Sequence, residues 1–340
     1  MDPAARERYS RQILFAPIGV AGQQRLMASR AVVAGCGALG SLQASALARA
    51  GVGQIVIIDR DYIEPGNLQR QWLFDEADAA EALPKAVAAA RKLAGINSSV
   101  RVEAMVADLT PGNAEELLLP AGVILDGTDN FDTRFLINDV AVKHGVPWIY
   151  GAAVASCGVA MPVLPGASAC LACVLPEPPS GPQPTCDTAG ILNAVTSLVA
   201  SWQVVEALKI LLGETDEVEP RLVSIDVWKN TWQSIATAER DPDCQVCGRR
   251  EFRRLAGVGR PPISLCGRNS VQIHERSRPI DLRALGETLR LLGEVRANEF
   301  ALRFTCPPYV MTVFPDGRAI IKGTTDTGVA RSLYARYVGQ

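Results

Sequence analysis

The chain has 340 residues, of which 48% are hydrophobic and 21% charged, and its formal net charge is −2. This length and apolar content predict one large domain with a real core and a smaller one. A net charge so close to zero argues against a general nucleic-acid binder. The start of the chain lacks an apolar run, so no signal peptide is visible, and nine cysteines are typical of a reducing cytoplasm rather than a disulfide framework.

The first half of the chain alternates short apolar runs with helical patterns, after two short helical pieces within residues 8–30. Buried strands are predicted at residues 31–37, 54–61, 100–108, 123–130 and 146–154. Helices are predicted at residues 38–51, 83–97 and 132–145. Such alternation predicts an α/β fold with a doubly wound, mostly parallel sheet.

The pattern changes after residue 155. Residues 157–164 and 221–237 are predicted to form longer, antiparallel strands. Between them, the Pro- and Gly-rich residues 176–184 predict a flexible loop. The apolar residues 189–213 include Asn193, Gln203, Glu206 and Lys209, and charges are costly in a bilayer, so we expect a buried or subunit-interface helix rather than a membrane span.

We expect two domains, residues 1–250 and a small α+β module at 251–340. In the module, helical patterns at 282–293 and 327–338 flank three predicted antiparallel strands. Residues 249–340 carry 16 Lys or Arg and 8 Asp or Glu, whereas residues 1–248 carry 18 and 28. The basic end could face an acidic protein partner, an RNA or the acidic main domain; we favour docking of an acidic protein.

A glycine-rich turn, GCGALG, follows the first predicted strand and opens a helix. Gly35 permits a tight turn, Gly37 lets a phosphate approach the backbone, and Gly40 lets helix and strand pack closely. Asp59 ends the second strand, where it is placed to bind ribose hydroxyls. This pattern alone does not distinguish NAD from ATP.

Basic residues after the second strand favour a triphosphate. Arg70 lies in NLQRQ, Lys85 starts the next helix, and both should lie at the mouth where phosphates would bind. The alternative is a solvated Arg and a solvated Lys. Asp129, in DGTDN, could hold Mg²⁺ through oxygen ligands or cap the following helix.

Four cysteines form two CxxC pairs that lie 70 residues apart in the sequence. This spacing predicts a closed site with four thiolate ligands for Zn²⁺, clipping two distant segments together; a redox role for one pair is the alternative. The predicted ligands are Cys170, Cys173, Cys244 and Cys247.

Several motifs in order resemble the MoeB/ThiF-type adenylyltransferases of the HesA/MoeB/ThiF family, bacterial relatives of ubiquitin-activating enzymes. They are RYSRQ, GCGALG, IIDRDYIEPGNLQRQ, Pro84–Lys85, DGTDN and the two CxxC pairs. The resemblance covers about residues 5–250. One departure is Ala38, where many bacterial members have glycine.

The resemblance implies a homodimer that uses Mg-ATP to adenylate the C-terminal glycine of a ubiquitin-like sulfur carrier, with a sulfur donor such as a cysteine desulfurase. It assigns Asp59 to the ribose, Asp129 to Mg²⁺, and Arg11 to the phosphates of the neighbouring subunit. The phosphate ligands that it implies are Asn67, Arg70 and Lys85.

Cys186 follows the predicted loop and resembles the cysteine that some relatives join covalently to the carrier; in others the cysteine at this place is dispensable. Cys266 could relay sulfur, although a structural role is the simpler interpretation. His144 closes a predicted helix and is interpreted as structural.

Three other functions remain open from the residues. An NAD-dependent oxidoreductase with a structural zinc explains the glycine turn and Asp59, but not NLQRQ, Lys85 and DGTDN together. A non-catalytic scaffold could retain the fold. A family relative could adenylate a peptide or a tRNA instead of a carrier.

Overall fold

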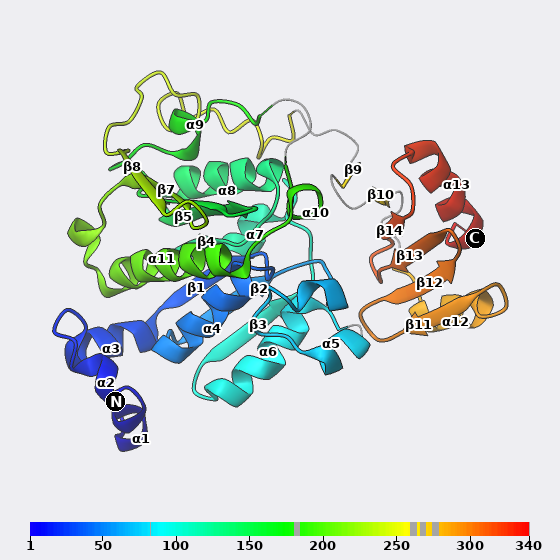
Figure 1. Cartoon of the computed structure of the whole chain (residues 1–340), viewed down its shortest axis with the longest axis horizontal. Coiled ribbons are helices and arrows are strands. Elements are labelled where there is room, and N and C mark those ends of the chain that lie inside the picture. Colours follow the sequence, from blue (N-terminus) through cyan, green and yellow to red (C-terminus); the bar gives the residue numbers. More distant parts are fainter. Residues whose placement is uncertain (82, 180–183, 259–263, 266–269, 274–278, 340) are drawn as a thin grey trace. The chain divides into compact units, whose positions relative to one another are not determined.

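The computed structural model describes residues 1–81, 83–179, 184–258, 264–265, 270–273 and 279–339. It contains two compact units, and each is described by itself (Figure 1). The larger comprises Met1–Ser180 and Gly190–Gly259, and the smaller comprises Gly181–Ala189 and Arg260–Gln340. Residues 180–183 of the predicted flexible loop and Cys266 lie outside the described residues.

The larger unit is built on an eight-stranded sheet with the order β3-β2-β1-β4-β5-β6-β7-β8. Its strands are β1 (Arg30–Ala34), β2 (Gln54–Ile58), β3 (Arg101–Met105), β4 (Val123–Asp126), β5 (Trp148–Val154), β6 (Cys157–Val163), β7 (Arg221–Asp226) and β8 (Thr231–Ala236). Neighbours from β3 to β5 are parallel, and those from β5 to β8 are antiparallel. The predicted mostly parallel sheet with antiparallel strands added is confirmed.

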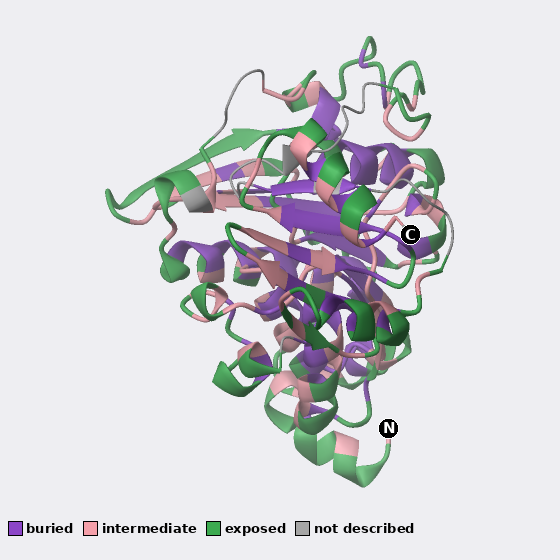
Figure 2. Ribbon diagram, turned by 90° about the vertical axis from the view of Figure 1, so that its right-hand side faces the viewer, coloured by how far each residue is buried: buried purple, intermediate pink, exposed green. Residues whose placement is uncertain are grey.

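Helices cover both faces of this sheet, which is why its central strands are apolar on both sides (Figure 2). On one face pack α3 (Gly19–Ala28), α4 (Gly40–Ala50), α6 (Lys85–Ile96) and α11 (Asn193–Leu212). On the other face pack α7 (Ala114–Leu118), α8 (Phe131–His144) and α9 (Leu171–Val174). The remaining elements of this unit are α1 (Pro3–Arg8), α2 (Ser10–Ile13), η1 (Pro65–Asn67), α5 (Glu76–Ala80) and η2 (Thr215–Glu217).

Helix α11 is long and apolar enough to cross a membrane by composition, with a mean hydropathy of 1.4. It packs instead against β5, β6 and α4 in the core, as predicted for a buried helix. The predicted start at residue 189 is wrong. Gly190 adopts a φ of +74°, which ends the short helix α10 (Cys186–Ala189), and Ile191 then bridges to Ala155.

The smaller unit has its own antiparallel sheet, in the order β11-β12-β13-β14-β10-β9. The strands are β9 (Ser264–Leu265), β10 (Ser270–Ile273), β11 (Glu294–Ala297), β12 (Leu302–Cys306), β13 (Tyr309–Val313) and β14 (Ala319–Lys322). Helices α12 (Leu282–Leu289) and α13 (Thr327–Tyr337) contribute Leu289 and Tyr334 to a core that also holds Phe304 and Met311.

The division between the units falls at residue 259 because the preceding segment is bonded to α8. The backbone N–H groups of Arg254 and Leu255 both donate to Asp139 Oδ2, at 2.9 and 3.1 Å. Arg254 also forms an ion pair with Glu177 at 3.2 Å. Residues 248–258, which directly follow the second CxxC pair, therefore belong structurally to the larger unit.

Candidate functional site

The candidate site lies where the strand order reverses, between β1 and β4. In doubly wound folds ligands bind in the crevice at the carboxyl ends of the strands at this point. Two turns meet there, the glycine turn 35–40 after β1 and the turn 127–130 after β4. A Cβ added at Gly127 would lie 2.5 Å from the carbonyl oxygen of Gly35, so only glycine lets the two turns pack this closely.

The glycines of the first turn differ in what surrounds them. A Cβ at Gly40 would lie 1.7 Å from the Gly35 carbonyl oxygen, whereas one at Gly37 would meet its nearest atom at 3.9 Å. Gly40 is therefore needed for packing within the protein, while the space beside Gly37 stays open. The close contact at Gly40 is the packing predicted for it, whereas the approach of a phosphate at Gly37 stays a prediction.

Asp59 joins the second strand to the glycine turn. Its carboxylate accepts hydrogen bonds from the backbone N–H groups of Cys36 and Asp61, both at 2.6 Å. Burial raises the pKa of the Asp59 carboxyl, and the nearby Lys85 ammonium and the two N–H donors oppose that rise. The predicted ribose ligand thus lies beside the glycine turn.

Lys85 is the first residue of α6, as predicted, and its ammonium group lies near the carboxylates of Asp59 and Asp61. Its side chain is only 3% exposed, and Nζ lies 3.2 Å from Asp61 Oδ2. A buried ammonium group needs such a partner, because burial without one is costly. The position of Lys85 is therefore set by the acidic residues at the end of β2.

The other predicted phosphate ligands are held in the segment after β2. Arg70 donates to the carbonyl oxygen of Gly66 at 3.0 Å, and it forms no ion pair with any residue that the structure describes. Asn67 Oδ1 accepts from the backbone N–H of Glu64 at 3.1 Å as part of a helix cap. Arg70 keeps its charge available for a ligand, whereas the Asn67 carbonyl oxygen already has a partner.

Arg60 is a site residue that the sequence analysis missed. Its guanidinium group lies 2.9 Å from Asp108 and 3.8 Å from Asp61. Burial lowers its pKa, but the carboxylates of Asp108, Asp61, Asp129 and Asp59 more than offset this and raise it. Asp129 therefore lies close enough to interact with Arg60. The signal was available: Arg60 directly follows the predicted ribose ligand.

Two more residues near these turns were missed. Gln71 is 3% exposed, and its Nε2 lies 4.0 Å from where a Gly37 Cβ would stand; its buried Oε1 has no hydrogen-bond partner among the described residues. Arg134, in the first turns of α8, forms a buried ion pair with Asp126. Nothing in the local pattern distinguishes either from an ordinary polar residue.

The four cysteines of the CxxC pairs come together, as predicted, next to α8. Their sulfur atoms all lie within 4.8 Å of one another, with Sγ–Sγ distances of 3.9 Å for Cys170–Cys173, 3.7 Å for Cys170–Cys244 and 3.3 Å for Cys173–Cys247. Asn138 of α8 accepts a hydrogen bond from the backbone N–H of Leu171, so α8 orients the first pair. This set of four thiols can bind one metal ion.

Comparison with known proteins identifies the family. The model of the ThiF family matches residues 9–246. The chain belongs to the ThiF family. This membership confirms the predicted family.

Two curated relatives of this ThiF family member are informative. It is 47% identical over 336 residues to the sulfur carrier protein ThiS adenylyltransferase of Bacillus subtilis, covering 98% of this chain and 99% of that protein. It is 38% identical over 249 residues to the SAMP-activating enzyme E1 of Haloferax volcanii, covering 73% and 91%. The crystal structure of E. coli MccB with ATP is similar with a TM-score of 0.61 and 25% identity, over 71% of this chain and 74% of that one.

Arg11, a predicted site residue of this ThiF family member, lies apart from the two turns. Arg11 is exposed on α2, and its neighbour Gln12 donates to the carbonyl oxygen of Ala50, at the end of α4 remote from the glycine turn. An eleven-residue helix spans about 16 Å, so Arg11 lies far from the site of its own chain. Cys186, half-buried, is the first residue of α10 in the smaller unit.

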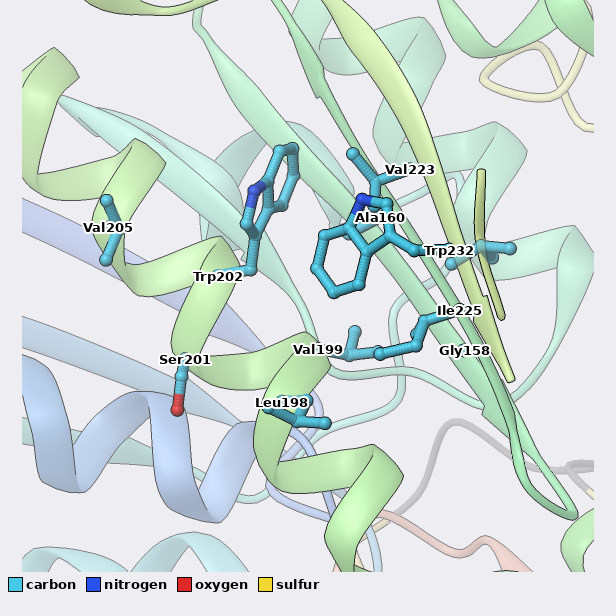
Figure 3. A pocket seen from close by; sticks show the side chains of 11 residues that line it. Gly158, Ala160, Leu198, Val199, Ser201, Trp202, Val205, Val223, Ile225 and Trp232 are labelled. Atoms are coloured by element: carbon cyan, nitrogen blue, oxygen red, sulfur yellow. The ribbon is translucent and has the colours of Figure 1, made fainter. Parts of the chain in front are cut away.

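An apolar groove lies between α11 and the antiparallel strands of the larger unit. Figure 3 shows Trp202 projecting from α11 and Trp232 from β8 into this cavity of about 250 Å³. Leu198 and Val205 of α11 are 48% and 50% exposed at its rim. Apolar surface of this kind on a helix and an edge strand marks an interaction site.

Proposed function

We propose that this chain uses ATP to adenylate the C-terminal glycine of a ubiquitin-like sulfur carrier, releasing pyrophosphate, in molybdopterin, thiamine or a related thiolation pathway of the cytoplasm. The observation that carries the proposal is the packing of the glycine turn against turn 127–130, with Asp59 and the buried Lys85 beside them. Family membership and 47% identity to a ThiS adenylyltransferase support it.

In this proposal Asp59 binds the ribose hydroxyls, and its position against the glycine turn supports that role. Arg70 and Lys85, with Asn67, bind the phosphates. The ionised carboxylate of the carrier attacks the α-phosphorus, an acyl–phosphate bond forms, and the bond from the α-phosphorus to the bridging oxygen breaks. No general base is required, because the carboxylate is already ionised at pH 7.

Pyrophosphate leaves with its charge balanced by the cationic side chains of the site. We assign Asp129 to Mg²⁺, a hard cation that prefers carboxylate ligands and neutralises phosphate charge when bound. The interaction of Asp129 with Arg60, the residue after Asp59, supports this assignment. Asn67 is the least supported ligand, because its side-chain oxygen already caps η1.

We assign the four-cysteine cluster to a structural Zn²⁺. Four thiolates at the usual Zn–S distance of about 2.3 Å lie about 3.8 Å apart in a tetrahedron, close to the three Sγ–Sγ distances given above. Burial raises the pKa of the Cys247 thiol to about 12 and also raises that of Cys170. Metal binding must therefore displace protons, and it would fasten residues 170–173 to residues 244–247.

We propose that the chain functions as a homodimer, in which Arg11 of each subunit serves the site of the other. The distance of Arg11 from its own glycine turn supports this arrangement. A second copy would cover the groove at Leu198 and Val205. Replacing both residues with Glu should give a monomer by light scattering with little ATP–pyrophosphate exchange, and an active monomer would contradict the arrangement.

Cys186 is assigned to a covalent link with the carrier: its thiolate attacks the carbonyl carbon of the acyl–adenylate, a thioester forms, the acyl–phosphate bond breaks and AMP leaves. A cysteine desulfurase is the proposed sulfur donor. Changing Cys186 to Ala should keep ATP–pyrophosphate exchange and abolish the carrier–enzyme adduct seen by mass spectrometry. An undiminished adduct would exclude this role.

The smaller unit is proposed to dock the carrier. Its own core supports an independent module. Residues 260–278 hold 4 Arg and 1 Glu, and residues 279–339 hold 8 basic and 6 acidic ones, while Arg249, Arg250, Arg253 and Arg254 belong to the larger unit. Deleting residues 260–340 should raise the KM for the carrier and leave ATP binding intact. An unchanged KM would count against docking.

The decisive experiment measures ATP–pyrophosphate exchange with candidate carriers. A second measurement asks whether ATP or NAD raises the melting temperature of the enzyme. Carrier-dependent exchange and protection by ATP are expected. Protection by NAD alone would favour an NAD-dependent oxidoreductase. ATP binding without pyrophosphate exchange would favour a non-catalytic scaffold. Exchange that depends on a peptide or a tRNA would favour a family relative that adenylates that acceptor. E. coli MccB, which is 25% identical to this chain, has been crystallised with AMPCPP and MccA, so MccA is included among the acceptors tested.

A further inference from the structure

Asp126, the last residue of β4, is held from three helices. Its backbone carbonyl oxygen accepts hydrogen bonds from Gln43 Nε2 of α4 at 3.0 Å and from Gln203 Nε2 of α11 at 2.9 Å. The two amides also bond to each other, at 2.6 Å. A third helix, α8, reaches the carboxylate through Arg134. The strand end that precedes the turn 127–130 therefore has a single well-defined position.

The Asp126 carboxylate and Arg134 together hold Thr128, the residue before Asp129. Asp126 Oδ1 accepts from the backbone N–H of Thr128 at 2.9 Å and from its hydroxyl at 2.7 Å. Arg134 donates to the carbonyl oxygen of Thr128 at 2.8 Å, and its Nε lies 3.4 Å from Asp126 Oδ2. Both backbone polar groups of Thr128 are thus bonded to this ion pair.

The ion pair is enclosed by protein. Asp126 is fully buried, the Arg134 side chain is 7% exposed, and the guanidinium group lies 5.2 Å from the Phe131 ring and 5.5 Å from the Tyr150 ring. Burial raises the pKa of the Asp126 carboxyl, and Arg134 opposes this rise. Arg134 is therefore committed to the turn rather than to a ligand.

Stability alone does not account for such a pair. Replacing a buried ion pair with neutral side chains of similar volume is often neutral or stabilising, whereas removing one partner costs about 3–5 kcal/mol. What the pair supplies here is geometry, because it fixes the turn that packs Gly127 against the glycine turn and presents Asp129. A displacement of about 1 Å in such a group can cost roughly 10²-fold in rate.

We propose that Arg134, through its ion pair with Asp126, is a positioning residue for the adenylation step and holds Asp129 in register with the glycine turn. This inference rests on the proposed function. It assigns a role in the reaction to a side chain that contacts neither the nucleotide nor the carrier.

The test separates position from stability. Arg134→Met leaves a buried carboxylate unpaired and should be strongly destabilised. The double variant Arg134→Met with Asp126→Asn removes both charges, so it should recover most of the melting temperature. Its kcat for carrier-dependent exchange should stay at least about 10-fold low, with less than about a threefold change in the Kd for ATP, because the Thr128 carbonyl still has no donor. Arg134→Lys keeps the charge and should give an intermediate kcat.

Asp139→Ala provides the control. Asp139 of α8 is, like Asp126, a buried carboxylate, but it accepts hydrogen bonds from residues 254 and 255 rather than from the turn 127–130. It should lower the melting temperature without lowering kcat. Amide hydrogen exchange of the peptide 123–133 should become faster in the Arg134 variants and stay unchanged in Asp139→Ala.

The outcomes distinguish the two proposals. A wild-type protein without exchange activity would refute the proposed function, and the amide exchange would then decide the positioning role alone. A stable double variant with wild-type kcat and unchanged amide exchange would overturn the role of Arg134. An equal loss of kcat in Asp139→Ala would overturn it as well, since the effect would then follow stability.

Discussion

Changing Gly37 to Ala should separate ligand binding from folding. The φ of Gly37 lies outside the left-handed region, and an added Cβ would meet its nearest protein atom at 3.9 Å, an ordinary contact. Alanine therefore fits the folded chain without strain. The added methyl group would stand in the space where the proposed site brings phosphate oxygens close to the backbone.

The substitution should affect stability and ATP binding in opposite directions. A strain-free change from Gly to Ala stabilises a protein by about 0.4–1 kcal/mol, so the melting temperature should stay equal or rise slightly. A displacement of the phosphates by about 1 Å should weaken the reaction roughly 10²-fold, which corresponds to about 2.7 kcal/mol. Differential scanning fluorimetry measures the first effect, and calorimetric titration with ATP together with pyrophosphate exchange measures the second.

Two other glycines serve as controls. Gly95, inside α6, has no atom within 4 Å of an added Cβ, so Gly95→Ala should stabilise the chain and leave ATP binding unchanged. Gly40→Ala places its Cβ 1.7 Å from a carbonyl oxygen and should lose both stability and binding. If Gly37→Ala bound ATP with wild-type affinity, the proposed phosphate site would be wrong.

Three further changes test other parts of the structure. Burial raises the pKa of the Asp139 carboxyl to about 6, so the stability linked to its protonation is full below pH 4 and falls as the pH rises through 6, while its hydrogen bonds to residues 254 and 255 remain. Asp139→Asn should remove up to about 3 kcal/mol of this pH dependence in urea titrations from pH 4 to 7, and unchanged curves would refute the shift. Cys244→Ser should lower the zinc content measured by atomic absorption from one ion per chain, together with the urea midpoint; a zinc-free wild type would contradict the metal assignment. Tyr9→Phe removes a 2.8 Å hydrogen bond from Asn97 and should cost about 1 kcal/mol, or about 2–4 °C in melting temperature, whereas no shift would show that water replaces the hydroxyl.

Much of the site could be predicted because its signals are local. The glycine turn follows a buried strand and opens a helix within six residues, and Lys85 begins α6 as its pattern indicated. The two CxxC pairs required no fold to suggest a shared metal, since four thiols in pairs are typical of one site. The start of the long helix was misplaced because Gly190 breaks a run of otherwise apolar residues.

Several contacts around the site join residues that are distant in the chain. Gln43 and Gln203 are 160 positions apart and meet only because α4 and α11 pack on the same face of the sheet. Arg60 lies next to Asp108 because β2 and β3 are parallel neighbours. No short window of the sequence contains both members of such a pair, so no periodicity or motif can indicate the contact, even though the place of Arg60 after Asp59 could have marked it as a candidate.

Strand alternation, glycine placement and cysteine spacing were enough to state the fold class, the family and most candidate ligands, because each depends on the backbone conformation or chemistry of a few adjacent residues. Only the folded chain revealed the buried pair Asp126–Arg134, the enclosed ammonium of Lys85 and the remoteness of Arg11 from its own glycine turn. Each of these features depends on which elements pack around a residue. The sheet order and the packing of the helices set this for the larger unit, and no local segment of the sequence determines it.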